Sequence, residues 1–269
     1  MKQYSKKNII NTLKKIGIKK GSVVLIHSAF HTLGTMKSIA INNIPKEIYY
    51  TIKKYLGSKG TIVVPAFFYD YSRKKKTFDL YKSPPDISLG IFSKYIFNNQ
   101  KFLRSKNPIT SLAATGYLAK KICGKSNSRP YGKGSAWEEL TNSNSYILFF
   151  GTTLANSLTY IHYIEFLAGV PHMYLKKFNI PIKEKGKIIE KEGLAYVRYL
   201  DFNIEVDLKK FEKDLKNKGL LKSKKLGSGF VSSVKCKDIL NFGLKKIIKN
   251  SFYFLKQNPS FRKNSYPLK

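Results

Sequence analysis

The chain has 269 residues, is 42% hydrophobic and carries a formal net charge of +34 at pH 7. This is enough for one large domain, or a domain with an appendage, and no apolar run of about 18 residues predicts a transmembrane helix. The basic N-terminus lacks a following apolar region, so no secretory signal is expected. Cys123 and Cys236 lack metal or redox spacing. The expected location is therefore a reducing compartment, the cytoplasm.

The charge invites a nucleic-acid-binding interpretation, which the rest of the sequence does not favour. The lysines are scattered and accompany many Asn, Ile, Tyr and Phe residues, as AT-rich codon usage would produce. No zinc-finger, RNP or KH signature is present. We therefore expect no specific nucleic-acid partner, although the charge can attract anionic small molecules.

The first two thirds of the chain alternate between helical and strand patterns. Helices are predicted over residues 8–16, 45–56, 87–97 and 157–168, and buried strands over 22–26, 61–67, 111–115 and 146–150. Short Val- and Ile-rich strands that alternate with helices are typical of parallel sheets with right-handed crossovers. The predicted fold class is α/β, with a mainly parallel central sheet flanked by helices.

The composition changes after about residue 175. A hairpin is predicted around Gly186, strands over 194–200 and 230–234, and helices over 207–216 and 238–255. The expected organisation is a core region over residues 1–175 and a mixed α+β portion over 176–269 that packs on the same core.

Polar side chains follow two predicted strands directly. His27 and Ser28 follow the first strand, and Tyr69 and Asp70 follow the second. A strand-end histidine is commonly a hydrogen-bonded polar residue, and an aspartate there is commonly a turn former. Because ligands of open α/β sheets bind at the carboxyl ends of the strands, two such ends indicate a candidate site.

Two glycine loops are candidates for holding a phosphate or a pantetheine arm. The first follows His27-Ser28 and contains Leu33-Gly34, and the second runs from Tyr131 through Gly132 to Ser135. Either loop can equally be a tight turn. No Walker motif or strand-following GxGxxG is present, which excludes nucleotide hydrolysis and dinucleotide redox chemistry.

The pair His162 and Glu165 gives the most specific chemical signal. At a spacing of three, the two side chains share one face of a helix, and their neighbours are mostly apolar. A buried carboxylate needs a partner, and a His/Glu pair makes a proton acceptor with tunable basicity. The alternative is a structural pair on an amphipathic helix.

Taken together, the blocks resemble the aminoglycoside 3-N-acetyltransferase family (the antibiotic N-acetyltransferase fold). The resemblance extends over about residues 5–180. The segments that carry it are 21–28, Leu33-Gly34, 60–65, 67–70, 104–116, 131–135 and 162–171. It implies an α/β fold, an acyl-CoA donor, no metal, and a sugar amine that attacks the thioester directly while a base removes its proton.

One departure from the family concerns the segment that begins at Arg104. This segment contains Pro108. Antibiotic-modifying members carry a histidine two residues after the corresponding proline, whereas this chain has Thr110 in that place. Threonine is no base near neutral pH, so the expected base is Glu165 assisted by His162, with His27 as the alternative. A non-catalytic relative is another possibility that Thr110 raises.

The motif around His162 looks more like relatives among surface-polysaccharide genes that acylate amino sugars. Residues 1–180 contain seven acids, and a basic run over residues 73–76 follows Asp70. A basic rim suits an anionic, nucleotide-linked amino sugar, whereas a polycationic aminoglycoside needs acids. The predicted function is thus acyl-CoA-dependent N-acylation of an amino sugar in glycan biosynthesis, with aminoglycoside N-acetylation as the alternative.

The expected site comprises three sets of residues, in a chain that is a possible homo-oligomer. The catalytic set is Glu165, His162 and His27; the coenzyme A set is Ser28, Phe30, Leu33, Gly34, Ser111, Tyr131, Gly132 and Ser135; and the acceptor set is Tyr69, Asp70, Arg104 and Thr110.

Overall fold

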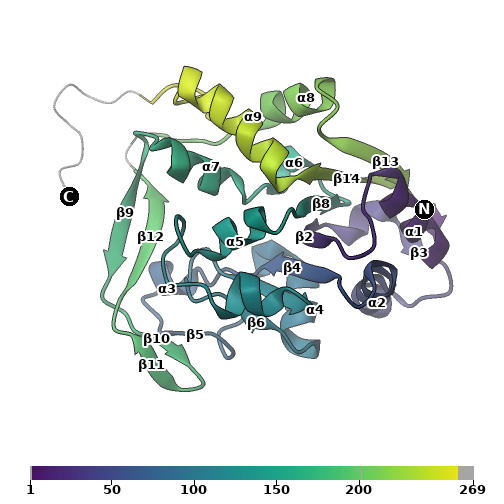
Figure 1. Cartoon of the computed structure of the whole chain (residues 1–269), viewed down its shortest axis with the longest axis horizontal. Coiled ribbons are helices and arrows are strands. Elements are labelled where there is room, and N and C mark those ends of the chain that lie inside the picture. The colour runs from purple at the N-terminus through teal and green to yellow at the C-terminus, as the bar shows by residue number, and fades with distance from the viewer. Residues whose placement is uncertain (1, 201, 260–269) are drawn as a thin grey trace.

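A seven-stranded mixed sheet forms the centre of the computed structural model, which describes residues 2–200 and 202–259 (Figure 1). In their order across the sheet, the strands are β13 (Lys222–Leu226), β14 (Gly229–Lys235), β8 (Tyr146–Phe150), β2 (Val23–Ser28), β4 (Thr61–Pro65), β7 (Leu112–Gly116) and β6 (Leu103–Arg104).

The α/β class is confirmed, but the expectation of a mainly parallel sheet is wrong. Among the described pairings of this sheet, only β8 with β2 and β2 with β4 are parallel, with Leu25 opposite both Ile147 and Val63. The other four pairings are antiparallel. The buried runs of the three central strands gave the parallel signal, whereas the hairpin of β13 and β14, which turns at Gly227-Ser228, was not recognised in the sequence.

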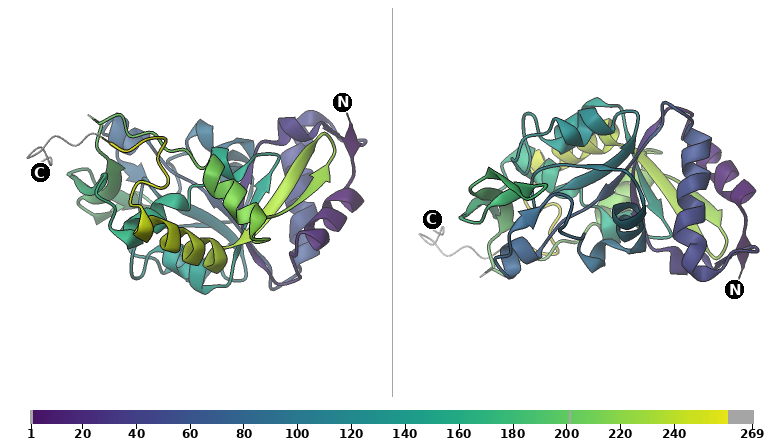
Figure 2. Two further views of the ribbon diagram at one scale, coloured as in Figure 1. Left: turned by 90° about the horizontal axis from the view of Figure 1, so that it is seen from above. Right: turned by 90° about the horizontal axis from the view of Figure 1, so that it is seen from below.

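Helices cover both faces of the sheet, as Figure 2 shows. Alternate residues of β2 point to opposite layers: Leu25 packs in one core cluster and Val24 in the other. The first layer contains α5 (Ala136–Asn142), α7 (Ile161–Ala168), α8 (Lys209–Asn217) and α9 (Cys236–Lys249), and the second contains α1 (Lys6–Lys15), α2 (Ile44–Leu56) and α4 (Ile91–Asn99).

Local chemistry explains where the main helices begin and end. The Ser5 hydroxyl accepts a hydrogen bond from the Asn8 N–H in a capping box that starts α1. Pro45 lies in the first turn of α2, and Gly57 closes that helix as predicted. The predicted helix over 157–168 instead divides, because Leu158 has extended backbone angles between α6 (Leu154–Ser157) and α7.

The remaining elements are short. They are β1 (Gln3–Tyr4), β3 (Thr35–Met36), α3 (Asp70–Arg73), β5 (Phe78–Asp79), β9 (Met173–Phe178), β10 (Ile182–Glu184), β11 (Lys187–Glu190) and β12 (Gly193–Arg198), with single-turn segments at Phe30–Leu33, Ile41–Asn43, Ile87–Leu89 and Lys120–Gly124. The hairpin around Gly186 is confirmed. Helix α9 ends at Lys249, six residues earlier than expected.

The C-terminal portion joins the first layer directly. Strand β14 extends the central sheet beside β8, and Ile239 of α9 belongs to the same core cluster as Leu25. The boundary expected near residue 175 stays a prediction. In the part of the chain that the structure describes, no helix is both long and apolar enough to cross a membrane.

Candidate active site

A cleft of about 390 Å³ opens at the carboxyl ends of the central parallel strands. The last residues of β2 and β4, Ser28 and Pro65, both line it. Its other lining residues are His27, Phe67, Tyr69, Ser88, Leu89, Ala155, Asn156, Ser157, Leu158, Thr159, Ile161, His162, Arg198, Val206 and Leu208. We call it the histidine cleft, and its position is the one expected for a ligand site of an open α/β sheet.

Helix α7 brings a histidine that is paired with a buried carboxylate to this cleft. His162 Nδ1 lies 2.7 Å from Glu165 Oε2, so the predicted pair forms. His162 lines the cleft with 34% of its side chain exposed, whereas the Glu165 side chain is 1% exposed and does not line it. A carboxylate acceptor fixes the proton on Nδ1 and leaves the Nε2 lone pair for a substrate.

Glu165 is the buried, ionised member of this pair. Burial raises the pKa of its carboxyl, but hydrogen bonds from His162 and His172 outweigh that effect and lower the pKa to about 2. So weak a base does not suit proton abstraction near neutral pH. This geometry favours His162 over Glu165 as the proton acceptor, which is the opposite of the order expected from the sequence.

His27 faces the same cleft from the end of β2. Its ring stacks on Phe149 of the neighbouring strand at 5.7 Å, and its Nε2 lies 3.4 Å from the Thr159 hydroxyl. Burial lowers the pKa of His27 to about 3, which keeps the imidazole uncharged at neutral pH. An uncharged imidazole of this kind suits hydrogen bonding to a carbonyl oxygen better than accepting a proton.

A second cavity of about 570 Å³ adjoins the histidine cleft, with Ser28 and Ser88 in both linings. We call it the apolar cavity. Its other lining residues are Ala29, Phe30, His31, Gly34, Thr35, Ile41, Ile44, Pro45, Gly90 and Ile91. The structure thus places Ser28, Phe30 and Gly34 of the expected coenzyme A set together. Leu33 does not join them, because its side chain is fully buried in the core.

The expected wall at Arg104 and Ser111 is not part of either cavity. Arg104 is 1% exposed, and its guanidinium donates to the Ser111 hydroxyl and to backbone carbonyls that include that of Ala66. It also lies over the Phe78 ring at 4.5 Å. A buried guanidinium must have such partners, so Arg104 and Ser111 are structural rather than ligand-facing.

Thr110 is likewise committed to internal contacts. It is 4% exposed, and its hydroxyl lies 3.0 Å from both Asn107 Oδ1 and the Pro130 carbonyl oxygen, either of which can accept its proton. Its own carbonyl accepts a hydrogen bond from Trp137. These contacts do not place Thr110 at the acceptor, which corrects the assignment made from the sequence.

The acceptor pair expected after β4 divides in the same way. Tyr69 lines the histidine cleft, but the Asp70 carboxylate binds the ammonium groups of Lys74 and Lys76 at 3.2 and 2.8 Å. Strand β4 ends at Pro65, so Asp70 lies five residues beyond it and begins α3.

The second glycine loop is a structural turn. Tyr131 is 2% exposed within an aromatic group that includes Phe166, and a Cβ at Gly132 would lie 3.2 Å from Phe166. Ser135 caps α5 by accepting from the Glu138 N–H. These residues line neither cavity, contrary to the coenzyme A contacts expected for them.

Sequence reasoning missed two polar contributors. His172 contacts Glu165 Oε1 at 3.1 Å, and Arg198 of β12 lines the histidine cleft. The first follows Gly169-Val170-Pro171, a turn signal that places it back beside α7. Arg198 arrives through a long hairpin and has no local signal.

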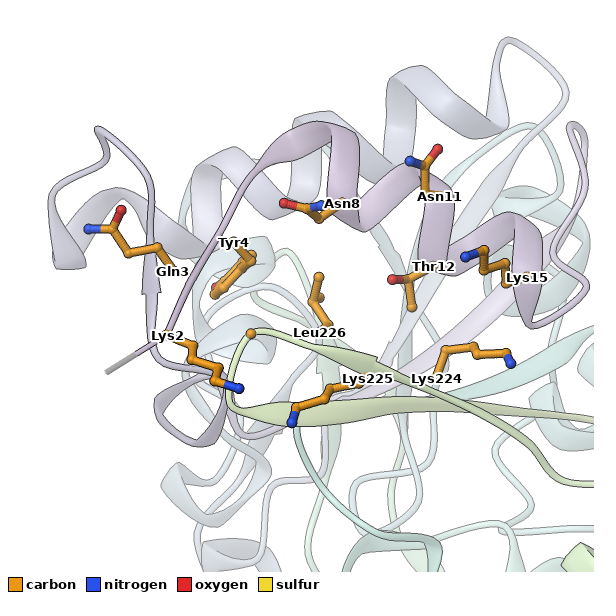
Figure 3. Close-up of a pocket in the computed structure, with 11 residues that line it drawn as sticks. Lys2, Gln3, Tyr4, Asn8, Asn11, Thr12, Lys15, Lys224, Lys225 and Leu226 are labelled. Atoms are coloured by element: carbon orange, nitrogen blue, oxygen red, sulfur yellow. The ribbon is translucent and has the colours of Figure 1, made fainter.

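A third hollow lies between α1 and β13 (Figure 3). Its charged lining residues are all lysines, namely Lys2, Lys15, Lys224 and Lys225. Among the described residues that line it there is no histidine or carboxylate, so none of them is a proton acceptor near neutral pH. Within residues 2–200 and 202–259, no group of His, Cys, Asp and Glu is suited to hold a metal ion.

A carboxylate-paired histidine in a cleft at the strand ends, beside a cavity with room for a second substrate, is an arrangement typical of group-transfer enzymes. The chain belongs to the aminoglycoside 3-N-acetyltransferase family, whose model matches residues 25–247.

Curated relatives agree with this membership. Aminoglycoside N(3)-acetyltransferase IV of Salmonella sp is 23% identical over 253 residues, which cover 94% of this chain and 91% of that protein. The SPbeta prophage-derived aminoglycoside N(3')-acetyltransferase-like protein YokD of Bacillus subtilis (strain 168) is 25% identical, over 70% of this chain and 74% of that protein. These names do not confirm the narrower placement among polysaccharide-associated relatives.

Solved structures show the same fold. Aminoglycoside acetyltransferase AAC(3)-Xa matches with a TM-score of 0.77 at 18% identity, covering 92% of this chain and 93% of that one. The structure of AAC-IIIb in a binary complex with CoASH matches with a TM-score of 0.76 at 19% identity. The match covers 96% of this chain and 100% of that one. The expected coenzyme A cofactor is confirmed at the level of the family.

Proposed function

We propose that this protein transfers the acetyl group of acetyl-CoA to an amine of an amino sugar. The observation that carries the proposal is the orientation of His162 by a buried, ionised Glu165 in the cleft that adjoins the apolar cavity. Family membership supplies the reaction class.

The chemistry follows from the placement of these groups. The amine nitrogen attacks the thioester carbonyl carbon as His162 Nε2 takes the amine proton. Glu165 stabilises the imidazolium that forms. His27 and Ser28 line the same cleft, and we assign them the hydrogen bonds to the carbonyl oxygen as it gains negative charge. The tetrahedral intermediate then expels the coenzyme A thiolate, which receives the proton from His162.

The apolar cavity is the proposed site of the donor's pantetheine arm. Ile91 lines it with 57% exposure, whereas Ile248 of α9 is 76% exposed and lies outside it. We expect Ile91→Gln to weaken acetyl-CoA binding about tenfold through lost apolar contact, and Ile248→Gln to leave it unchanged. Isothermal titration with acetyl-CoA measures both, and equal dissociation constants for the two variants would place the donor elsewhere.

Two acceptor classes have separate support. The names of the relatives favour aminoglycosides, which is the first candidate. The lining of the histidine cleft favours an anionic acceptor, such as the nucleotide-linked amino sugar of glycan biosynthesis that the sequence suggested. Arg198 lines that cleft, and no aspartate or glutamate does so among the described residues.

Salt dependence separates these acceptors. With Arg198 in the cleft and a net charge of +34, a polycationic aminoglycoside is repelled, so its KM should fall as salt screens the repulsion. The KM of a nucleotide-linked amino sugar should rise over the same range. Initial rates of coenzyme A release at about 20–300 mM salt measure both. An aminoglycoside KM that rises with salt would show acidic contacts that this cleft lacks, and would remove the electrostatic support for the second candidate.

A further inference from the structure

His172 holds the second oxygen of the Glu165 carboxylate. His172 Nε2 lies 3.1 Å from Oε1, while His162 Nδ1 lies 2.7 Å from Oε2. The side chains of His172 and Glu165 are 0% and 1% exposed. One buried carboxylate thus joins two imidazoles, only one of which reaches the histidine cleft.

The turn after α7 builds this arrangement. Gly169 adopts the left-handed conformation, with φ of 62°, and ends the helix. Pro171 follows, and β9 begins at Met173. The reversal returns His172 to Glu165, seven residues earlier in the chain, and its ring packs against Phe252 at 5.8 Å.

The surroundings fix the tautomer of His172. Its Nδ1 is buried and has no hydrogen-bond partner among the described residues. A proton there would bury an N–H group without an acceptor. The ring therefore carries its proton on Nε2, donates it to Oε1 and stays uncharged, which leaves Glu165 as the charged member of the trio.

We infer that His172 is a positioning residue for the proposed reaction, on which this inference rests. It fixes the Glu165 carboxylate so that Oε2 faces His162 Nδ1, and it keeps the carboxylate ionised while His162 takes the amine proton. A buried carboxylate with one donor can rotate or take a proton itself. Two donors on separate oxygens prevent both.

The other titratable groups around the trio do not compete. The phenols of Tyr131 and Tyr196 lie near Glu165, and burial raises the pKa of each. Arg198 faces the cleft and keeps its charge. Within the trio, the group that exchanges a proton with the substrate in the proposed reaction is therefore His162 alone.

Two substitutions test the role of His172. His172→Phe keeps a ring against Phe252 but removes the donor, whereas His172→Gln retains an N–H group that can reach Oε1. We expect His172→Phe to lower kcat about tenfold or more at unchanged KM for acetyl-CoA. In His172→Phe, the fall of kcat/KM at acidic pH (its acidic limb) should move to higher pH. Without the His172 donor, the Glu165 carboxylate is less stabilised and therefore attracts the protonated His162 ring more strongly. The kcat of His172→Gln should remain within about threefold of the unsubstituted value, and its acidic limb should stay at the same pH.

A core variant far from the site, Ile52→Val in α2, controls for loss of stability alone and should leave the limb where it is. An unmoved limb in His172→Phe, or equal impairment in His172→Gln, would overturn the inference.

Imidazole nitrogen NMR separates this inference from the proposed function. The chain has only four histidines, so each ring can be assigned. In the unsubstituted protein, His172 should remain uncharged with its proton on Nε2 between about pH 5 and 9. If NMR shows this uncharged His172 but no amine is acetylated, the proposed function is refuted, whereas the contacts that join His172, Glu165 and His162 still stand. A charged His172 in this range would overturn the inference even if His172→Phe fails to fold.

Discussion

Replacing His162 with asparagine is expected to lower kcat roughly 10²- to 10⁴-fold. The asparagine amide can still donate to Glu165 Oε2, so the buried carboxylate keeps its partner. What disappears is the Nε2 lone pair that takes the amine proton. Steady-state rates of coenzyme A release, measured with a saturating amine, give the ratio directly.

The same variant provides its own controls. Its dissociation constant for acetyl-CoA should match that of the unsubstituted protein, because the apolar cavity does not contain His162. Added imidazole should restore part of the rate, since the missing ring leaves space in an open cleft. A kcat within twofold of the unsubstituted value would show that the base lies elsewhere, with His27 the next residue to test.

Glu165→Gln is expected to be nearly as damaging, up to about 10⁴-fold in kcat, for a different reason. A glutamine amide can donate to His162 Nδ1, which moves the ring proton to Nε2. The lone pair then points at the protein and the N–H at the substrate. A buried carboxylate outside the cleft, Asp79, provides the matched control. Asp79→Asn should lower stability but not kcat, and equal kcat losses in both variants would point to misfolding rather than lost orientation.

Glu165 should also make stability depend on pH. Its folded-state pKa of about 2 lies below the ordinary value of 4.5, so its stabilisation is present in full above the ordinary value. The contribution is lost as the pH falls from about 4.5 through 2, and amounts to a few kcal/mol. Denaturant unfolding over this range should show a steeper loss in the unsubstituted protein than in Glu165→Gln, and parallel curves would contradict the assignment.

The sequence predicted the contact between His162 and Glu165 because helical spacing alone dictates it. The expected base was Glu165, whereas the proposed mechanism assigns that role to His162, and the spacing does not say which of the two side chains reaches the cleft. That depends on which face of α7 is buried, and burial is decided by β12, α9 and the turn at Gly169. The partner on the other carboxylate oxygen, His172, is visible only after that turn is folded.

Long-range packing also explains the other differences. The segment around Arg104 reads as a loop near a ligand, yet its guanidinium fills the core by binding backbone carbonyls of distant segments. The parallel pairing of β2, β4 and β8 could be predicted from the sequence because each strand is a continuous, largely buried apolar run. The antiparallel pairings of β14 with β8 and of β7 with β4 join segments far apart in the chain, which no local pattern encodes.

The most direct test of this account is an assay of acetyl transfer with paired proteins. The unsubstituted protein and His162→Asn are incubated with acetyl-CoA and, separately, an aminoglycoside and a nucleotide-linked amino sugar, and products are identified by mass spectrometry. We expect the unsubstituted protein to form an N-acetylated product with at least one amine, with one coenzyme A released per product, and His162→Asn to form it at least about a hundredfold more slowly. Absence of any acetylated amine, or equal rates for the two proteins, would contradict the account.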